Sequence, residues 1–267
     1  MNDGNADGKL QSPKVDPADR LSLAFETNGK GCLGYILQLP GAYVRAPTER
    51  EALSKVMSEM KSYHRWLGAK PSPSVRTMIV QWHQSQLQVE DADNEILLDV
   101  DRKPFLDGEF ARLLDLVWYS GETIFKAYEK AELKEWVDES KRRNTFYGTV
   151  PSTIQEMLGH VDSSQDFYMA RLGVHLENGT NDFLEIRRRC VDELARLHDD
   201  GINSNLFSSE NELWTLKKVL RRLVWHDRIH GKAMIRILAK QKRMKLIDGY
   251  TDPFHFLRAS LEPRSEL

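Results

Sequence analysis

Two histidines one helical turn apart lie inside an apolar row, and no other feature of this 267-residue chain constrains its fold as strongly. His226 and His230 form an H-x-x-x-H pair, so they face the same side of a predicted helix. That side also carries Leu220, Leu223 and Met234. An imidazole directed into an apolar core costs free energy unless a hydrogen bond or a metal ion satisfies it. The pattern therefore predicts a helix packed within a bundle, with a polar site inside it.

A third histidine has the same character on a different predicted helix. His160 lies on the apolar side of a helix that we expect to open at residues 151–153. Three imidazoles can satisfy one another through a shared divalent transition ion, and Zn, Ni, Fe and Mn all accept imidazole nitrogen. Three ligands leave the ion open positions for water or substrate, as in catalytic sites. The sequence predicts one such ion on His160, His226 and His230, and it identifies no catalytic residue.

Composition excludes several other classes of function. Apolar residues are 40% and charged residues 29% of the chain, which is typical of a globular protein. The net charge of -2 provides no overall electrostatic field that would attract nucleic acid or an anionic membrane. No apolar run approaches the roughly 20 residues of a membrane span. We interpret the basic clusters at 187–189, 217–218, 221–222 and 240–245 as solvated helix faces. Asp227 projects about 100° from His226, so we expect a solvated side chain there, with support of a metal ligand as the alternative. Nucleic acid and membrane are therefore not expected as partners.

The cysteines and the N-terminus indicate a reducing cytoplasm. Cys32 and Cys190 are far apart on different predicted elements, which argues against a disulfide framework. Cys190 lies on an apolar helix row, so we expect a buried structural thiol rather than a nucleophile. Residues 1–20 lack the apolar core of a signal peptide and predict a disordered tail. We expect a cytoplasmic protein.

The chain changes character near residue 105, which predicts a mixed α+β fold in two parts. Residues 21–105 predict a small α/β domain, whose helix opens with Thr48 and Glu51 at capping-box spacing. Residues 106–245 predict a four-helix bundle, whose last helix is capped by Ser209, and residues 246–267 a C-terminal extension. Strands of the first part are predicted at 21–26, 32–39, 43–44, 76–82, 86–89 and 95–100.

Two segments of the second part resemble the DinB-like family. Residues 152–161 (STIQEMLGHV) resemble its second-helix motif, and residues 220–230 (LRRLVWHDRIH) its last-helix motif. The resemblance implies a four-helix bundle whose metal ligands are His160, His226 and His230. It also implies a small-molecule substrate and one of two activities: a thiol-dependent S-transferase that uses a low-molecular-weight thiol, or a metal-dependent hydrolase.

The first part resembles the small HicB-like α/β fold. The similarity depends on the turn at Gly29–Gly31, the apolar run that ends at Leu39-Pro40-Gly41, and the helix start at residues 48–52. It implies an alternative in which the chain is a non-enzymatic binding or regulatory protein. The HicB-like domain would then recognise a partner, and the metal site would be structural or vestigial. The sequence leaves the choice open, as it does the formation of a homodimer.

Overall fold

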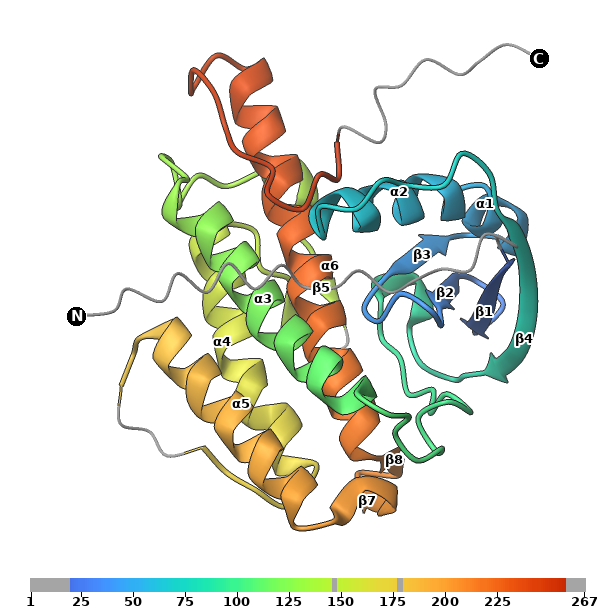
Figure 1. Cartoon of the computed structure of the whole chain (residues 1–267). Helices are drawn as coiled ribbons and strands as arrows, with labels where there is room; N and C mark the ends of the chain where they lie inside the picture. The colour runs from blue at the N-terminus through green and yellow to red at the C-terminus, as the bar shows by residue number, and fades with distance from the viewer. Residues whose placement is uncertain (1–19, 146–147, 177–179, 258–267) are drawn as a thin grey trace.

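A computed structural model describes residues 20–145, 148–176 and 180–257. A four-stranded sheet with two short helices lies beside a group of long helices (Figure 1), so the mixed α+β class is confirmed. The tail predicted for residues 1–20 lies outside the described residues, except that Arg20 begins the first strand. Of the predicted C-terminal extension, residues 246–257 are described.

The sheet contains three antiparallel strands and one parallel edge strand. Its order is β3-β2-β1-β4, with β1 (Arg20–Thr27) antiparallel to β2 (Cys32–Ile36) and parallel to β4 (Arg76–Gln84). Strand β3 (Tyr43–Ala46) pairs with β2. A parallel neighbour needs a crossover connection, which α1 (Glu49–Leu53) and α2 (Val56–Trp66) supply. The predicted cap is confirmed, because the Thr48 side chain accepts the N–H of Glu51.

Both faces of the sheet are covered. Leu21, Leu23 and Phe25 of β1 belong to the large core that includes α2, whereas Ala24 belongs to a second cluster on the opposite face. Residues from the segment 85–101 and Trp225 complete that second cluster. The edge strand β4 leaves three apolar side chains exposed: Met78, Val80 and Trp82.

The strands predicted at 86–89 and 95–100 are wrong. This segment contains one 3-10 turn, η1 (Val89–Asp91), and is otherwise irregular. Side chains of the sheet satisfy its backbone instead. Gln81 Nε2 donates to the Leu97 carbonyl at 3.1 Å, and Gln81 Oε1 accepts the Asp99 N–H at 2.9 Å. Alternating polarity indicates that one side of a segment packs on an apolar surface; it does not show that the backbone pairs with a neighbouring strand.

Four long helices pack beside the sheet: α3 (Glu109–Glu129), α4 (Ile154–Ala170), α5 (Phe183–Asp199) and α6 (Leu216–Arg243). Helix α4 opens with a complete capping box between Thr153 and Glu156, where the sequence places its start. The 3-10 turns η2 (Glu139–Lys141) and η3 (Ile202–Ser204) lie in connections.

Two short hairpins also interrupt the helical part, in which the sequence predicts none. They pair β5 (Asn144–Thr145) with β6 (Gly148–Thr149), and β7 (Phe207–Ser209) with β8 (Glu212–Trp214). Ser209 is therefore in a strand, and the cap predicted there is wrong. Thr215 caps α6 instead, where its side chain accepts the N–H of Lys218 at 3.1 Å.

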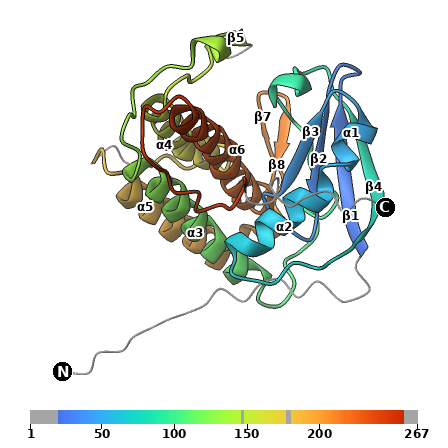
Figure 2. The ribbon, with the colours of Figure 1, turned by 90° about the horizontal axis from the view of Figure 1, so that it is seen from above.

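Helix α6 lies between the sheet and the other three helices (Figures 1 and 2), and its first half has no solvated face. Every residue from Trp214 to Arg228 is buried. The prediction of solvated faces at 217–218 and 221–222 is therefore wrong. Three of these cations pair with carboxylates, Lys217 with Glu109, Lys218 with Glu212 at 2.6 Å and Arg221 with Asp101 at 2.5 Å. Arg222 donates instead to the Asn94 carbonyl at 3.2 Å.

The turn after β2 packs directly on α6. Gly41 has a φ of +83°, and a Cβ atom there would lie 2.5 Å from the Val224 side chain. Glycine is required both for the left-handed backbone and for the close approach. A second link is the ion pair between buried Arg228 and buried Glu59 of α2, at 2.7 Å. One hydrophobic core thus runs from the sheet through α2 into the four helices.

Candidate metal site

The three predicted ligands come together between α4 and α6. The ring centroids of His160 and His226 are 5.0 Å apart, those of His160 and His230 4.8 Å, and those of His226 and His230 4.5 Å. One nitrogen from each ring lies within 4.8 Å of the other two. A tetrahedral ion with bonds of about 2.0–2.1 Å needs nitrogens roughly 3.3 Å apart. The three nitrogens therefore lie no more than about 1.5 Å beyond the spacing that such an ion requires.

A hydrogen bond to Ser164 sets the tautomer of His226. The Ser164 hydroxyl donates its single proton to the Val161 carbonyl at 2.7 Å and lies 3.0 Å from His226 Nδ1. The hydroxyl oxygen can then only accept from Nδ1, which places the proton of the neutral ring there. The Nε2 lone pair is thereby left free for a ligand bond. A metal-binding histidine typically makes this kind of supporting bond through its other nitrogen.

The environment keeps the imidazoles neutral. Burial and the two neighbouring histidines lower the pKa of His226 well below its usual range. Burial, followed by the effect of His160, lowers the pKa of His230 to about 3, and burial also lowers the pKa of His160. Neutral imidazole is the form that binds a metal ion. The donor set therefore fits a divalent transition ion.

The site combines one buried ligand with two that reach the surface. His226 is buried against Tyr168 and Trp225, whereas His160 and His230 each keep part of their surface exposed. Among the described residues, no cysteine or carboxylate joins the histidines as a fourth member of the group. Such an arrangement leaves coordination positions that water or a small ligand can reach.

Asp227 does not occupy the solvated position predicted for it. Its carboxylate is fully buried and binds both terminal nitrogens of Arg187, at 2.7 and 2.9 Å, and it accepts a hydrogen bond from Ser120. Arg187 also donates to Gln165 of α4 at 2.6 Å. The network thus connects all four long helices and fixes the rotation of α6 next to His226. Sequence reasoning missed it, because a cation within the run Arg187-Arg188-Arg189 resembles a surface residue.

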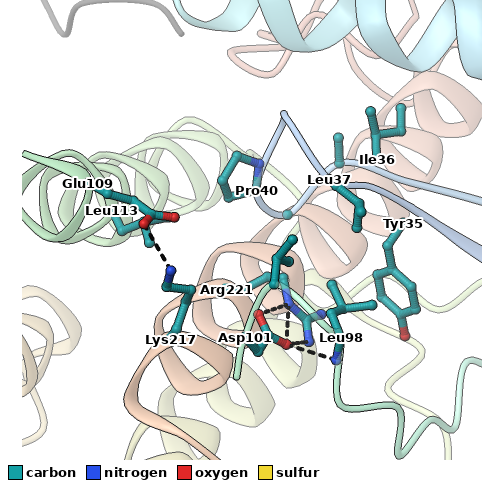
Figure 3. A pocket seen from close by; sticks show the side chains of 13 residues that line it. Tyr35, Ile36, Leu37, Pro40, Leu98, Asp101, Glu109, Leu113, Lys217 and Arg221 are labelled. Carbon is teal, nitrogen blue, oxygen red and sulfur yellow. Dashed lines mark hydrogen bonds and ion pairs between the residues drawn. The ribbon is translucent and has the colours of Figure 1, made fainter. Parts of the chain in front are cut away.

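A separate small pocket lies between the β2–β3 turn and the first turns of α3 and α6 (Figure 3). Its wall contains two ion pairs, Asp101–Arg221 and Glu109–Lys217. Its volume is about 40 Å³, far below the several hundred Å³ of a typical small-molecule site. None of the three histidines lines it. It is therefore not the substrate site of a centre built on them.

The metal-free protein is expected to lose stability as the pH falls from about 7.5 to 5.5. The unfolded chain binds protons near the ordinary histidine pKa of about 6.5, whereas the lowered pKa values of His226 and His230 keep the folded rings neutral. Excess proton uptake by the unfolded state favours unfolding. Urea denaturation across this range measures the slope. His230→Gln should flatten it and His175→Gln should not, because His175 is largely exposed; equal slopes in all three proteins would contradict the account.

Both cysteines should resist modification until the protein unfolds. Cys32 and Cys190 are free and buried, and burial raises the pKa of Cys190 to about 12. The reactive species is the thiolate, so Cys190 lacks both access and ionisation. An aromatic disulfide reagent at pH 8 should label neither thiol in native protein on the timescale that labels both in urea. Rapid labelling of Cys190 in the folded protein would contradict the interpretation of this residue as a buried structural thiol.

Comparison with known proteins identifies no relative of this chain. No protein-family model, curated protein or solved structure matches it. Within the described ranges, no helix combines the length and apolar character needed to cross a membrane. The assignment of function therefore depends on the histidine site and its surroundings.

Proposed function

We propose that the chain is a DinB-like metalloenzyme that acts on a small molecule through a divalent ion held by His160, His226 and His230. The observation that carries the proposal is the convergence of three neutral imidazoles from two helices, with no fourth protein ligand in the described group. The order of the helices supports it. The histidine of the first motif lies on α4 and the two histidines of the second motif lie on α6, and these are the second and fourth of the four long helices. A HicB-like character of residues 21–105 remains part of the same proposal.

The surrounding residues have distinct roles in this proposal. Ser164 orients His226, and the buried Arg187–Asp227 pair holds α6 in register with α3, α4 and α5. When bound, the ion supplies Lewis acidity, which activates water or keeps a thiolate nucleophilic near neutral pH. The partial exposure of His160 and His230 allows a substrate to approach from the solvent. This exposure favours an enzyme over the alternative of a closed structural site in a binding or regulatory protein.

Both activities implied by the resemblance use such a site. A thiol-dependent S-transferase needs a position for the sulfur of a low-molecular-weight thiol, and a hydrolase needs one for water. The ion would lower the pKa of either bound ligand, so a bound thiol or a bound water could each be ionised near neutral pH. The three-histidine group therefore supports both reactions, and a test with a thiol distinguishes them.

Cobalt substitution tests the proposal. Addition of a small thiol to the Co²⁺ protein should produce thiolate-to-metal charge-transfer absorption in the near ultraviolet, and His226→Ala should abolish it. A change with thiol in the wild type but not in the variant supports an open, thiol-accepting site. A spectrum that stays constant at saturating thiol would contradict the transferase, and tetrahedral Co²⁺ bands without any exchangeable ligand would contradict the enzyme altogether.

A further inference from the structure

We infer a second divalent-cation site in the sheet part of the molecule, formed by Glu26, His83 and Glu95. It shares no residue with the three-histidine site and does not depend on the proposed function. One carboxylate oxygen or ring nitrogen from each of the three residues lies within 4.8 Å of the other two. Two carboxylates and one imidazole form a donor set that accepts Zn²⁺ or Mn²⁺.

The fold brings the three residues together from separate segments. Glu26 of β1 and His83 of β4 are paired in the parallel register of these strands, so their side chains share one face of the sheet. This is the face that carries Ala24 and is covered by the segment 85–101. Glu95 belongs to that covering segment, and its backbone N–H donates to Glu26 Oε1 at 2.8 Å. The site thus lies where the covering segment meets the sheet.

A buried carboxylate oxygen without a partner points to a ligand. Glu26 is fully buried, and its Oε2 atom has no hydrogen-bond partner among the described residues. An unpaired buried carboxylate oxygen costs considerable free energy, and native structures generally pair such atoms. A cation between Glu26, His83 and Glu95 would satisfy Oε2 and leave Oε1 on the Glu95 N–H. The orphaned oxygen is therefore an observation independent of the clustering.

The other two ligands are oriented and accessible. Glu95 Oε1 accepts from the Ser85 hydroxyl at 2.8 Å and lies 3.2 Å from His83 Nε2. The His83 and Glu95 side chains are 37% and 33% exposed, so an ion can enter from the solvent. Support of a carboxylate ligand by a hydroxyl is a common feature of metal sites.

The basic side chains near Glu26 have other partners. Arg222 acts on Glu26 through its charge, but its Nη1 donates to the Asn94 carbonyl at 3.2 Å. Lys218 is already paired with Glu212. A divalent ion between Glu26, His83 and Glu95 would supply a direct positive partner for Glu26 Oε2 and fasten the segment 85–101 to the sheet.

The stoichiometry of Zn²⁺ binding tests the inference. Tag-free full-length protein is titrated with Zn²⁺ by calorimetry, and the wild type should bind two ions. His83→Ala and the near-isosteric Glu26→Gln should each remove one ion or weaken its binding at least about tenfold. His226→Ala should retain the sheet ion, and the His83→Ala/His226→Ala double variant should bind none tightly. His175→Ala is the matched control, because His175 also contacts a carboxylate, that of Asp166, outside any group of three.

The outcomes separate this inference from the proposed function. If His83→Ala and Glu26→Gln bind as many ions as the wild type, the sheet site does not exist. The same holds if the wild type binds a single ion that His226→Ala abolishes. A single ion that is lost in His83→Ala but retained in His226→Ala would support the sheet site and contradict the three-histidine site. Circular dichroism of each variant confirms folding, and Glu26→Gln decides the result if His83→Ala is unfolded.

Discussion

Asp227→Ala is expected to destabilise the protein by about 3–5 kcal/mol, because it leaves the guanidinium of Arg187 buried without its counter-charge. Both side chains are essentially inaccessible to solvent, and the carboxylate binds two guanidinium nitrogens. Removal of the carboxylate also removes one of the two acceptors of the Ser120 hydroxyl and leaves it the Val117 carbonyl. Urea denaturation at neutral pH measures the loss as a lower midpoint with an unchanged slope.

A neighbouring arginine provides the control for this effect. Arg188 is half exposed and pairs with Glu185 and Asp192 on the surface of the same helix, so Arg188→Ala should cost at most about 1 kcal/mol. The double replacement Arg187→Met/Asp227→Leu should cost less than the sum of the two single replacements, because it leaves no buried charge without its partner. Equal losses in Arg187→Ala and Arg188→Ala would show that the buried pair does not organise the bundle.

The second large effect concerns metal affinity, which should fall in graded steps. His226→Ala removes the buried ligand and should weaken Zn²⁺ binding at the three-histidine site by more than about 100-fold. Ser164→Ala keeps all three ligands but frees the tautomer of His226, so about 10- to 100-fold is expected. Competition with a chromophoric chelator measures both, in the Glu26→Gln background so that only one site contributes. His175→Ala should change nothing.

The order of these effects distinguishes a metal site from a polar core. If the histidines merely satisfy one another, Ser164→Ala and His226→Ala should alter stability and leave Zn²⁺ affinity unchanged. If Ser164 has no part in orientation, its replacement should have no effect on affinity while His226→Ala still abolishes binding. Only the graded loss agrees with a ligand whose tautomer is fixed by the hydroxyl.

Local sequence patterns predicted the parts of the fold that depend on local chemistry. Thr48 and Thr153 cap α1 and α4 because a hydroxyl at that position satisfies free N–H groups, whatever surrounds the helix. The spacing of His226 and His230 places both on one side of α6, and the apolar row shows that this side is packed. Their approach to His160 required the packing of α4 against α6, which no local pattern contains.

The wrong predictions for buried charges share one cause, which is contact between segments distant in sequence. Arg221 was predicted to lie on the surface because its partner, Asp101, lies in another part of the chain. Lys218 pairs with the nearby Glu212, but its burial also depends on the distant Glu95, whose carbonyl accepts a hydrogen bond from it. Arg187 and Asp227 read as unrelated charges for the same reason. Helix α6 packs on two sides, so its basic residues are buried and need partners from other segments. The spacing of apolar residues alone cannot distinguish such a helix from one that has a solvated face.

Diffraction at the zinc absorption edge from crystals grown with Zn²⁺ tests the three-histidine site most directly. An anomalous peak is expected between α4 and α6, at about 2.0–2.1 Å from one nitrogen of each of His160, His226 and His230, with Ser164 still bonded to His226 Nδ1. At least one further ligand should be water or a molecule from solution. A folded protein with no anomalous density between these histidines, or with zinc bound at other residues only, would contradict the site and the function proposed from it.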